Sequence, residues 1–379
     1  MALSKILNAS VTDSTLTTTK LATPNLGRRN IIINGDMQIA QRSTSETGLG
    51  ASAGYFTLDR YVMYNGGDAS AGRYTMSQST VTDLEGFSNA LKIDCTTADT
   101  SIAAGEGLLL QQAIEGFNVQ QLKATSTTTK AFTLSFYAKS NASRAIVTEV
   151  RTSNGTNRQA CKLHTIGTSW ARHTFTVSAA SSMQIDNDNS SEVQINFWLH
   201  AGSTYSGGTL SATFAASNNA NRAAGAGSIF ASTDNTLEIT GVQLEVGSQA
   251  TPFEHRSYGE ELALCQRYFT VLADGNRSTS EAICQGTYYT ANILFHTVVL
   301  PVQMRSKPSM ITANGTNYYI TFANGSGDHH DAIARSGNSS KSVVEITAET
   351  NVAGTGGHAC FTRIGGTSAD AKCMLDAEL

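Results

Sequence analysis

Apolar and polar residues alternate in short runs along this chain, and this pattern determines which folds are possible. Two runs show it best, AFTLSFYAK from residue 131 and EVQINFWLH from residue 192. Successive side chains of a β-strand point to opposite faces, so each run predicts a strand with one apolar face. These faces carry Phe132, Leu134, Phe136 and Ala138 in the first run and Val193, Ile195, Phe197 and Leu199 in the second.

Similar runs recur along the chain between turns rich in Gly, Asn and Ser, and no long helical pattern interrupts them. Only 15% of the 379 residues are charged, so the charged residues that favour helices are scarce. The sequence therefore predicts an all-β fold with two antiparallel β-sandwich domains. The first, jelly-roll-like, spans residues 30–250 and has a bulge at Gly241; the second spans residues 270–379. The stretch 213–228 is interpreted as a surface loop.

Between the two domains, the charged stretch 251–269 predicts a short connecting amphipathic helix. Ser257 is an N-cap candidate, and Glu260 stands three residues later, as in a capping box. The apolar face of this helix would carry Leu262, Cys265 and Phe269. Ionisable neighbours on one helical turn supply neither a nucleophile beside its base nor two carboxylates across a cleft. No catalytic residue is therefore assigned.

The N-terminal segment, residues 1–29, has its apolar residues five positions apart in a field of Thr, Ser and Asn. These residues are Ile6, Val11, Leu16 and Leu21. A period of five matches neither a helix nor a strand, so the segment cannot bury one face of regular structure by itself. One interpretation is an extended anchor that threads along another protein or another copy of the chain. The alternative is a disordered tail.

Composition argues against several classes of protein. The net charge is −4 and no Lys/Arg cluster occurs, so nucleic-acid binding is not expected. No apolar run reaches the roughly 18 residues that span a membrane, and no secretory signal is present, so no membrane insertion is expected. The six cysteines form no CxxC pair and no zinc spacing with histidine, which favours buried free thiols. No cofactor is expected.

Several stretches resemble segments of bacteriophage tail fibre and related virion proteins. In that family, a stretch similar to ITGVQLEVGSQATPFEHRSYGEELALCQRYF lies at the end of a carbohydrate-binding-module-like sandwich. RRNIIINGDMQIAQR, with YFTLDRY behind it, resembles the start of that sandwich, and LPVQMRSKPSM resembles part of the domain that follows. The opening SVTDSTLTTTKLA is similar to the Thr-rich pieces with which such fibres begin.

The resemblance implies a tail fibre or tail appendage of a phage virion, assembled in the host cytoplasm as a homotrimer. Its N-terminal segment would be held by a tail tube, adaptor or baseplate protein. Its C-terminal domain would face the host. The two sandwich domains would bind a bacterial surface glycan or protein through many weak contacts, with no enzymatic activity. The chain has no heptad stretch and no long β-helix repeat, so a short fibre is expected. Two alternatives stay open: a host-glycan depolymerase and a purely structural collar or decoration protein.

Glycan binding by a sandwich needs exposed aromatic rings beside hydrogen-bonding groups, because a sugar has both apolar faces and hydroxyls. On the polar face of the second run, Trp198 alternates with Asn196 and His200, and Tyr137 is expected on the same sheet face. These four residues form the first candidate surface. The alternative is that Trp198 and Tyr137 pack under a long loop or at a subunit contact.

The C-terminal domain offers a second candidate surface around the loop GDHHDA. It consists of Tyr318, Tyr319, His329, His330 and Asp331. The two histidines and Asp331 are residue types that bind metals, but adjacent histidines point in different directions in most backbones. We therefore interpret this loop as a solvated turn and assign no metal ligands.

A possible calcium loop begins at residue 185 with the sequence IDNDNSSE. Its oxygen-bearing side chains alternate and are Asp186, Asp188, Ser190 and Glu192. An EF-hand is excluded because Phe197 takes the place of the twelfth-position glutamate and the central glycine is missing. A looser calcium site at a sandwich edge stays open.

Overall fold

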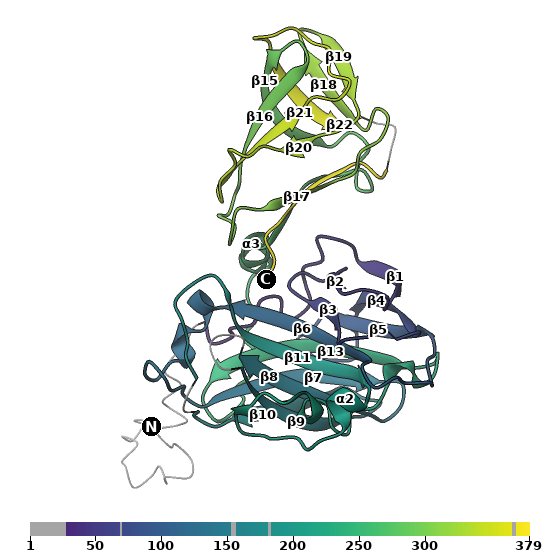
Figure 1. The fold of residues 1–379 in the computed structure, drawn as a ribbon, viewed down its shortest axis with the longest axis vertical. Coiled ribbons are helices and arrows are strands. Elements are labelled where there is room, and N and C mark those ends of the chain that lie inside the picture. The colour runs from purple at the N-terminus through teal and green to yellow at the C-terminus, as the bar shows by residue number, and fades with distance from the viewer. Residues whose placement is uncertain (1–27, 69, 153–156, 181–182, 366–368) are drawn as a thin grey trace, which may run out of the picture. The chain divides into compact units, whose positions relative to one another are not determined.

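The computed structural model describes residues 28–68, 70–152, 157–180, 183–365 and 369–379. The fold is all-β, as predicted, and the strands that pair within its four sheets are antiparallel (Figure 1). The chain divides into two compact units. The first contains the chain up to Gln38 together with Thr44–Arg256, and the second contains Ile39–Ser43 together with Ser257–Leu379.

The first unit contains a six-stranded and a seven-stranded sheet. The six-stranded sheet has the order β1 (Ser45–Leu49), β4 (Arg73–Thr80), β5 (Asn89–Thr97), β13 (Thr236–Val246), β7 (Phe132–Ser140) and β10 (Ala171–Val177). The seven-stranded sheet has the order β12 (Ala215–Ala216), β9 (Arg158–Ile166), β8 (Arg144–Thr152), β11 (Ser191–Ala201), β6 (Gly107–Glu115), β3 (Val62–Asn65) and β2 (Gly54–Tyr55). Short 3-10 turns lie at Gly116–Asn118, Gln120–Leu122, Asn219–Asn221 and Ile229–Ala231.

The two sheets pack face to face through the apolar sides of the two alternating runs. Phe136 of β7 and Phe197 of β11 meet edge to face, with ring centroids 5.0 Å apart. The remaining apolar residues of both runs are also buried. The alternation therefore located the sandwich core correctly, because burying one face of each strand is the main source of stability for such a sheet.

The predicted bulge at Gly241 is confirmed. The pairing of β13 with β7 shifts register between Thr240 and Gln243, and Gly241 has a φ of +59°. A Cβ atom at this position would lie 2.8 Å from the Phe87 ring and 2.9 Å from the Tyr137 ring. Both the backbone conformation and the close approach of the two rings thus require glycine.

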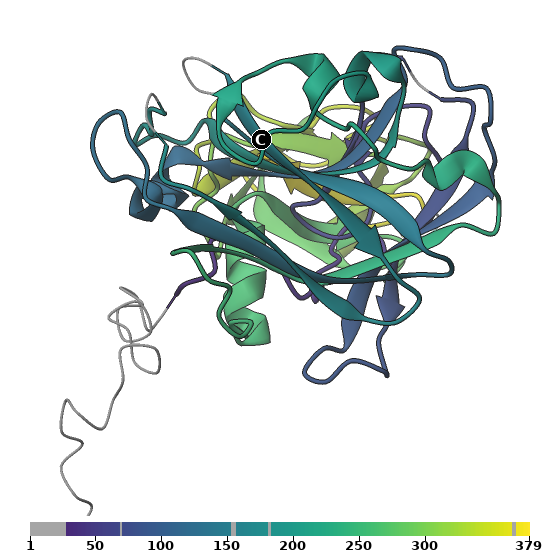
Figure 2. The same cartoon turned by 90° about the horizontal axis from the view of Figure 1, so that it is seen from below.

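The stretch 213–228 is not the simple surface loop that the sequence suggested. It contains β12, the 3-10 turn at Asn219–Asn221 and two buried side chains, Arg222 and Ala223. Together with helix α2 (Ser203–Ser206), this stretch covers the outer face of the seven-stranded sheet. Figure 2 shows the same fold from below, with these covering segments in teal. Strand β11 is therefore buried on both faces.

The predicted helix forms as α3 (Tyr258–Gln266). The hydroxyl of Ser257 accepts a hydrogen bond from the Glu260 N–H at 3.3 Å, as an N-cap should. The helix is shorter than predicted, because Phe269 already begins a strand. By its contacts α3 belongs to the second unit, whereas the extended residues 251–256 belong to the first.

The second unit contains a three-stranded and a seven-stranded sheet that share one apolar core. The smaller sheet has the order β14 (Phe269–Asp274), β23 (Lys372–Asp376) and β17 (Ser309–Thr312). The larger has the order β19 (Ser326–His330), β18 (Tyr319–Ala323), β22 (Ala359–Ile364), β15 (Ala282–Thr290), β16 (Ile293–Val299), β21 (Val343–Ala348) and β20 (Ala334–Arg335).

A short piece from the N-terminal part of the chain is built into this second unit. The guanidinium of Arg42 lies 3.6 Å from the ring centroid of Phe269. It also donates to the carboxylates of Asp376 at 3.2 Å and Glu378 at 3.3 Å. Ile39–Ser43 is thus part of the second unit's structure. The sequence pattern did not predict that a segment from the N-terminal part of the chain would belong to this unit.

The six cysteines all lie among the described residues and form no disulfide. Five are buried and Cys284 is half-buried, which agrees with the predicted free thiols. Within the described ranges, no helix has both the length and the apolar character needed to cross a bilayer.

Candidate functional site

The first candidate surface is not exposed. Trp198, Asn196 and His200 are all fully buried, so the prediction that they form an accessible surface is wrong. Trp198 packs against Tyr205 of α2, with ring centroids 5.1 Å apart, and the Arg222 guanidinium lies 4.8 Å from its ring. The alternative interpretation, packing under a long loop, describes Trp198 correctly.

The buried Glu149 explains why polar residues alternate through this strand. Its carboxylate accepts hydrogen bonds from Asn196 Nδ2 and Trp198 Nε1, each at 2.9 Å, and from two nitrogens of Arg222. Three of these donors lie on Oε2 and one lies on Oε1, so both oxygens of the buried carboxylate have partners. His200 bonds similarly to Glu106 and Ser228. This polar pattern therefore serves the structure of the first unit.

Tyr137 was expected on the same sheet face as Trp198, and that expectation is wrong. Tyr137 lies on β7 of the six-stranded sheet, whereas Trp198 lies on β11 of the seven-stranded sheet. The Tyr137 ring packs 5.2 Å from Phe87 and is half-buried. The four residues of the first candidate surface thus do not form one site.

The residues of the second candidate surface do not all lie at the surface of the protein, because some of them are buried in the core. GDHHDA is not a turn, because its first four residues belong to strand β19. Consequently His330 points into the core, where it stacks on the buried Tyr319 with ring centroids 5.8 Å apart. His329 is exposed on the opposite face.

Two further predicted residues, Tyr318 and Asp331, are half-buried. The Asp331 carboxylate accepts hydrogen bonds from the Asn317 backbone and from the Asn351 side chain. Roles in binding for His329, Tyr318 and Asp331 stay predictions. The anchor residues Ile6, Val11, Leu16 and Leu21 lie outside the described residues.

In the stretch that resembles a calcium loop, residues 185–192, polar side chains bond to backbone N–H groups of the same stretch. The Phe117 N–H, in the 3-10 turn Gly116–Asn118, also donates to the Asp188 carbonyl. Asp188 Oδ1 accepts from the Ser190 N–H at 2.9 Å, and the buried Glu192 accepts from the Asp186 N–H. Among the described residues no group of three or more His, Cys, Asp and Glu side chains is arranged to hold a metal ion.

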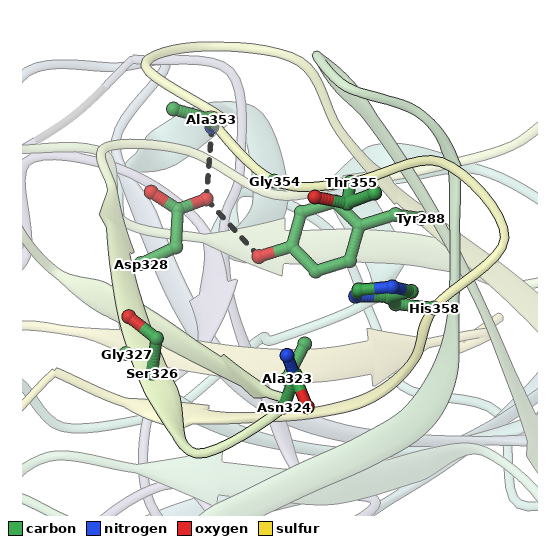
Figure 3. Close-up of a pocket in the computed structure, with 10 residues that line it drawn as sticks. All are labelled: Tyr288, Ala323, Asn324, Ser326, Gly327, Asp328, Ala353, Gly354, Thr355 and His358. Carbon is green, nitrogen blue, oxygen red and sulfur yellow. Dashed lines mark hydrogen bonds between the residues drawn. The ribbon is translucent and has the colours of Figure 1, made fainter.

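A polar pocket of ≈ 270 Å³ lies in the second unit, beside the turn of the β18–β19 hairpin (Figure 3). Three elements form it: β15, the β18–β19 hairpin, and the loop that precedes β22. Its lining residues are Tyr288, Ala323, Asn324, Ser326, Gly327, Asp328, Ala353, Gly354, Thr355 and His358. None of the predicted binding residues is among them.

Asp328 is the one carboxylate among these ten lining residues, and its position is fixed. Its Oδ2 accepts a hydrogen bond from the Tyr288 hydroxyl at 3.1 Å and from the Ala353 N–H at 2.9 Å. Figure 3 shows both bonds converging on this one oxygen. Oδ1 accepts no hydrogen bond from the described part of the chain, so it stays available to a ligand.

The loop before β22 is held tightly against Tyr288. Gly354 has no side chain, and a Cβ there would lie 2.0 Å from Cε1 of the Tyr288 ring. The Gly357 N–H donates to the Tyr288 carbonyl at 2.7 Å, and the Tyr288 N–H donates to the His358 carbonyl at 3.0 Å. The wall of the pocket is therefore pre-formed, which limits the entropy that a ligand would lose on ordering it.

Electrostatics keep the Tyr288 hydroxyl a hydrogen-bond donor. Burial raises the pKa of Tyr288 above its usual value, and the neighbouring Asp328 carboxylate raises it further. The phenol therefore stays protonated at neutral pH. It donates its proton to Asp328 Oδ2 and leaves the other carboxylate oxygen for a ligand.

The rest of the pocket rim consists of unengaged polar side chains. Asn324, Ser326, Thr355 and His358 line the pocket, and their side chains have no hydrogen-bond partner in the described ranges. Carboxylate, amide, hydroxyl and imidazole groups together suit a small ligand with many hydroxyls. The candidate stretch GDHHDA contains Asp328, but the residues predicted to bind were the neighbours of Asp328, because this strand was interpreted as a turn.

No protein-family model and no curated protein matches the chain. The solved structures that are similar to this chain include carbohydrate-binding modules and a phage tailspike domain. The structure described as "CBM4 structure and function" covers 56% of this chain and 98% of its own, at 16% identity and a TM-score of 0.29. The family 11 carbohydrate-binding module of Lic26A-Cel5E from Clostridium thermocellum covers 55% and 98%, at 12% identity and 0.27.

The tailspike match is to the enzymatically active domain of tailspike protein 4 from bacteriophage CBA120. It covers 57% of this chain at 13% identity and a TM-score of 0.27. The match covers only 21% of that tailspike chain. At these identities and TM-scores, none of the similar structures identifies a function for this protein.

Proposed function

We propose that the protein is a bacteriophage tail component that binds a bacterial surface glycan through the pocket around Asp328. The observation that carries the proposal is the Asp328 carboxylate, fixed through one oxygen and unengaged at the other. It stands among free amide, hydroxyl and imidazole groups, which match the hydroxyls of a sugar. The resemblance of several sequence stretches to tail fibre proteins supports the location in a virion tail.

The proposed action is binding without cleavage. Hydrolysis of a glycosidic bond generally uses two carboxyl groups, one on each side of the bond. The pocket lining supplies a single carboxylate, Asp328, so it lacks the second member of such a pair. A homotrimer held on the tail through residues 1–29 would present three such pockets. Avidity would then compensate for weak single contacts.

Cell binding tests this proposal. Fluorescently labelled full chain is incubated with a panel of bacterial strains, and a strain that binds it is treated with periodate, which oxidises sugar diols. We expect periodate treatment to reduce binding. We expect the Asp328→Asn variant to reduce it at least about tenfold, the equivalent of one charge-assisted hydrogen bond.

Tyr289→Ala is the matched control, because Tyr289 is 68% exposed and lines no part of the pocket. This variant should bind as the unaltered chain does. Binding that survives both periodate and Asp328→Asn would contradict a glycan receptor. Release of reducing sugar from the cells would instead favour a depolymerase, and absence of binding to any strain would favour a purely structural virion protein.

A further inference from the structure

A second groove, of ≈ 480 Å³, lies on the other side of the β18–β19 hairpin. Phe322 and Phe361 stand in register on the neighbouring strands β18 and β22, and Gln285 of β15 is paired with Phe361. Paired residues of antiparallel strands project from the same sheet face, so these three side chains form one row. That face is the outer one, since Thr321 and Thr362, the next pair along, are buried.

The two rings are stacked and one of them stays accessible. Their centroids are 5.1 Å apart and their planes are 18° from parallel. Phe322 is half-buried, and the Arg363 guanidinium lies 4.6 Å from its centroid. Phe361 is 45% exposed. The structure therefore fixes Phe322 from two sides and leaves the Phe361 ring open to a ligand.

Unengaged amides flank this open ring. Gln285 and Asn324 line the groove, and neither side-chain amide has a hydrogen-bond partner in the part of the chain that the structure describes. An exposed aromatic face beside free amides matches a sugar ring, which presents C–H groups on one face and hydroxyls around its edge. A protein partner would need a broader apolar area than one accessible ring.

The two cavities share the tip of the hairpin. Ala323 and Asn324 line both of them, the Asp328 pocket on one side and the Phe361 groove on the other. Asn324 and Gly325 have φ values of +50° and +77°, which form the tight turn that such a hairpin requires. The hairpin tip thus borders both cavities.

From this arrangement we infer that the Phe361 groove is a second carbohydrate subsite. It stacks one sugar ring on Phe361, while the Asp328 pocket binds another residue of the same glycan around the hairpin tip. This inference rests on the proposed function and deepens it. The ligand class becomes an oligosaccharide or polysaccharide, and a single monosaccharide would fill only one subsite.

The test uses the full chain and a panel of purified bacterial lipopolysaccharide O-chains and capsular polysaccharides immobilised on biosensors. For a polysaccharide that binds, Phe361→Ala should weaken the affinity about tenfold, the contribution expected of a well-packed aromatic contact. Tyr289→Ala should leave the affinity unchanged. Phe361→Trp should retain binding, and its added fluorescence should shift on saturation, since the native tryptophans, Trp170 and Trp198, lie in the first unit.

Three results would overturn the inference, and each has a different meaning. If Phe361→Ala binds like the unaltered chain and the Phe361→Trp signal does not respond while Asp328→Asn abolishes binding, the second subsite is refuted and the proposed function stands. If Phe361→Ala lowers the native mass of the protein, the groove is a contact between copies of the chain. If no glycan binds the unaltered chain, the proposed function fails together with the inference.

Discussion

Arg222 and Glu149 form a two-point ion pair inside the first unit. The guanidinium donates from Nε to Oε1 at 2.8 Å and from Nη2 to Oε2 at 3.0 Å, and Glu149 is fully buried. Arg222 lies in the segment that covers the seven-stranded sheet, whereas Glu149 lies on the sheet itself. The ion pair therefore links the covering segment 213–228 to the seven-stranded sheet.

Removing Arg222 should strongly destabilise the first unit. Arg222→Ala leaves the Glu149 carboxylate buried without its charge partner, and such a loss typically costs about 3–5 kcal/mol. Chemical denaturation followed by tryptophan fluorescence would measure the change. Lys92→Ala is the matched control, since the Lys92–Asp94 pair is partly exposed and should contribute less than about 1 kcal/mol. If both variants lowered the free energy of unfolding by the same amount, the Arg222–Glu149 pair would not be a special source of stability.

Acid should destabilise both units through buried histidines. Burial lowers the pKa of His164 to about 3 and that of His296 to about 4, from a usual value near 6.5. Between each lowered pKa and the usual value of 6.5, the unfolded chain binds more protons than the folded chain. The stability due to neutral histidine is thus complete above about pH 6.5 and falls as the pH is lowered toward 4 and then 3.

The free energy of unfolding measured against pH would show this effect. His164→Gln should reduce the slope between pH 6.5 and 4 for the first unit, and His296→Gln should do so for the second. His329→Gln is the control, because His329 is exposed. A slope that neither core variant changes would mean that these histidines do not couple folding to protonation.

Two glycines should respond in opposite ways to alanine. Gly241→Ala puts a Cβ on a residue with a φ of +59° and against the rings of Phe87 and Tyr137, and the backbone strain alone costs about 1–2 kcal/mol. Gly259 lies in helix α3 with open space around it. Gly259→Ala should therefore stabilise by up to about 1 kcal/mol. Thermal unfolding of the two variants would check both signs, and a neutral Gly241→Ala would contradict the bulge geometry.

The proposed homotrimer predicts a native mass three times the 40.1 kDa of one chain. Light scattering on a sizing column would measure it, and the value should persist on dilution. A stable monomer would refute the trimeric tail component without affecting the pocket, which is formed by residues of a single chain.

The period-two pattern was sufficient to predict the β-class, the sandwich core and the Gly241 bulge, because each depends on residues that are close in sequence. Predicting the burial of Trp198 was not possible in this way. Its cover comes from Tyr205 and Arg222, and its hydrogen-bond acceptor is Glu149 on another strand. An alternating polar face looks the same in sequence whether it meets water or a buried carboxylate.

The candidate pocket depends on contacts that are still more distant in sequence. Asp328 meets Tyr288, 40 residues away, and Ala353, 25 residues away. The only local signal was the Asn324–Gly325 pair, which is typical of a hairpin turn. Recognising that hairpin would have placed the following residues in a strand and His330 in the core.

Calorimetric titration would show whether Asp328 recognises a glycan. The full chain and its Asp328→Asn variant are each titrated with a bacterial polysaccharide selected from the panel. We expect a binding isotherm for the unaltered chain and a loss of affinity of at least about tenfold for the variant, with unchanged thermal stability. Equal affinities for the two proteins would contradict this expectation, because Asp328 would then play no part in recognising the glycan.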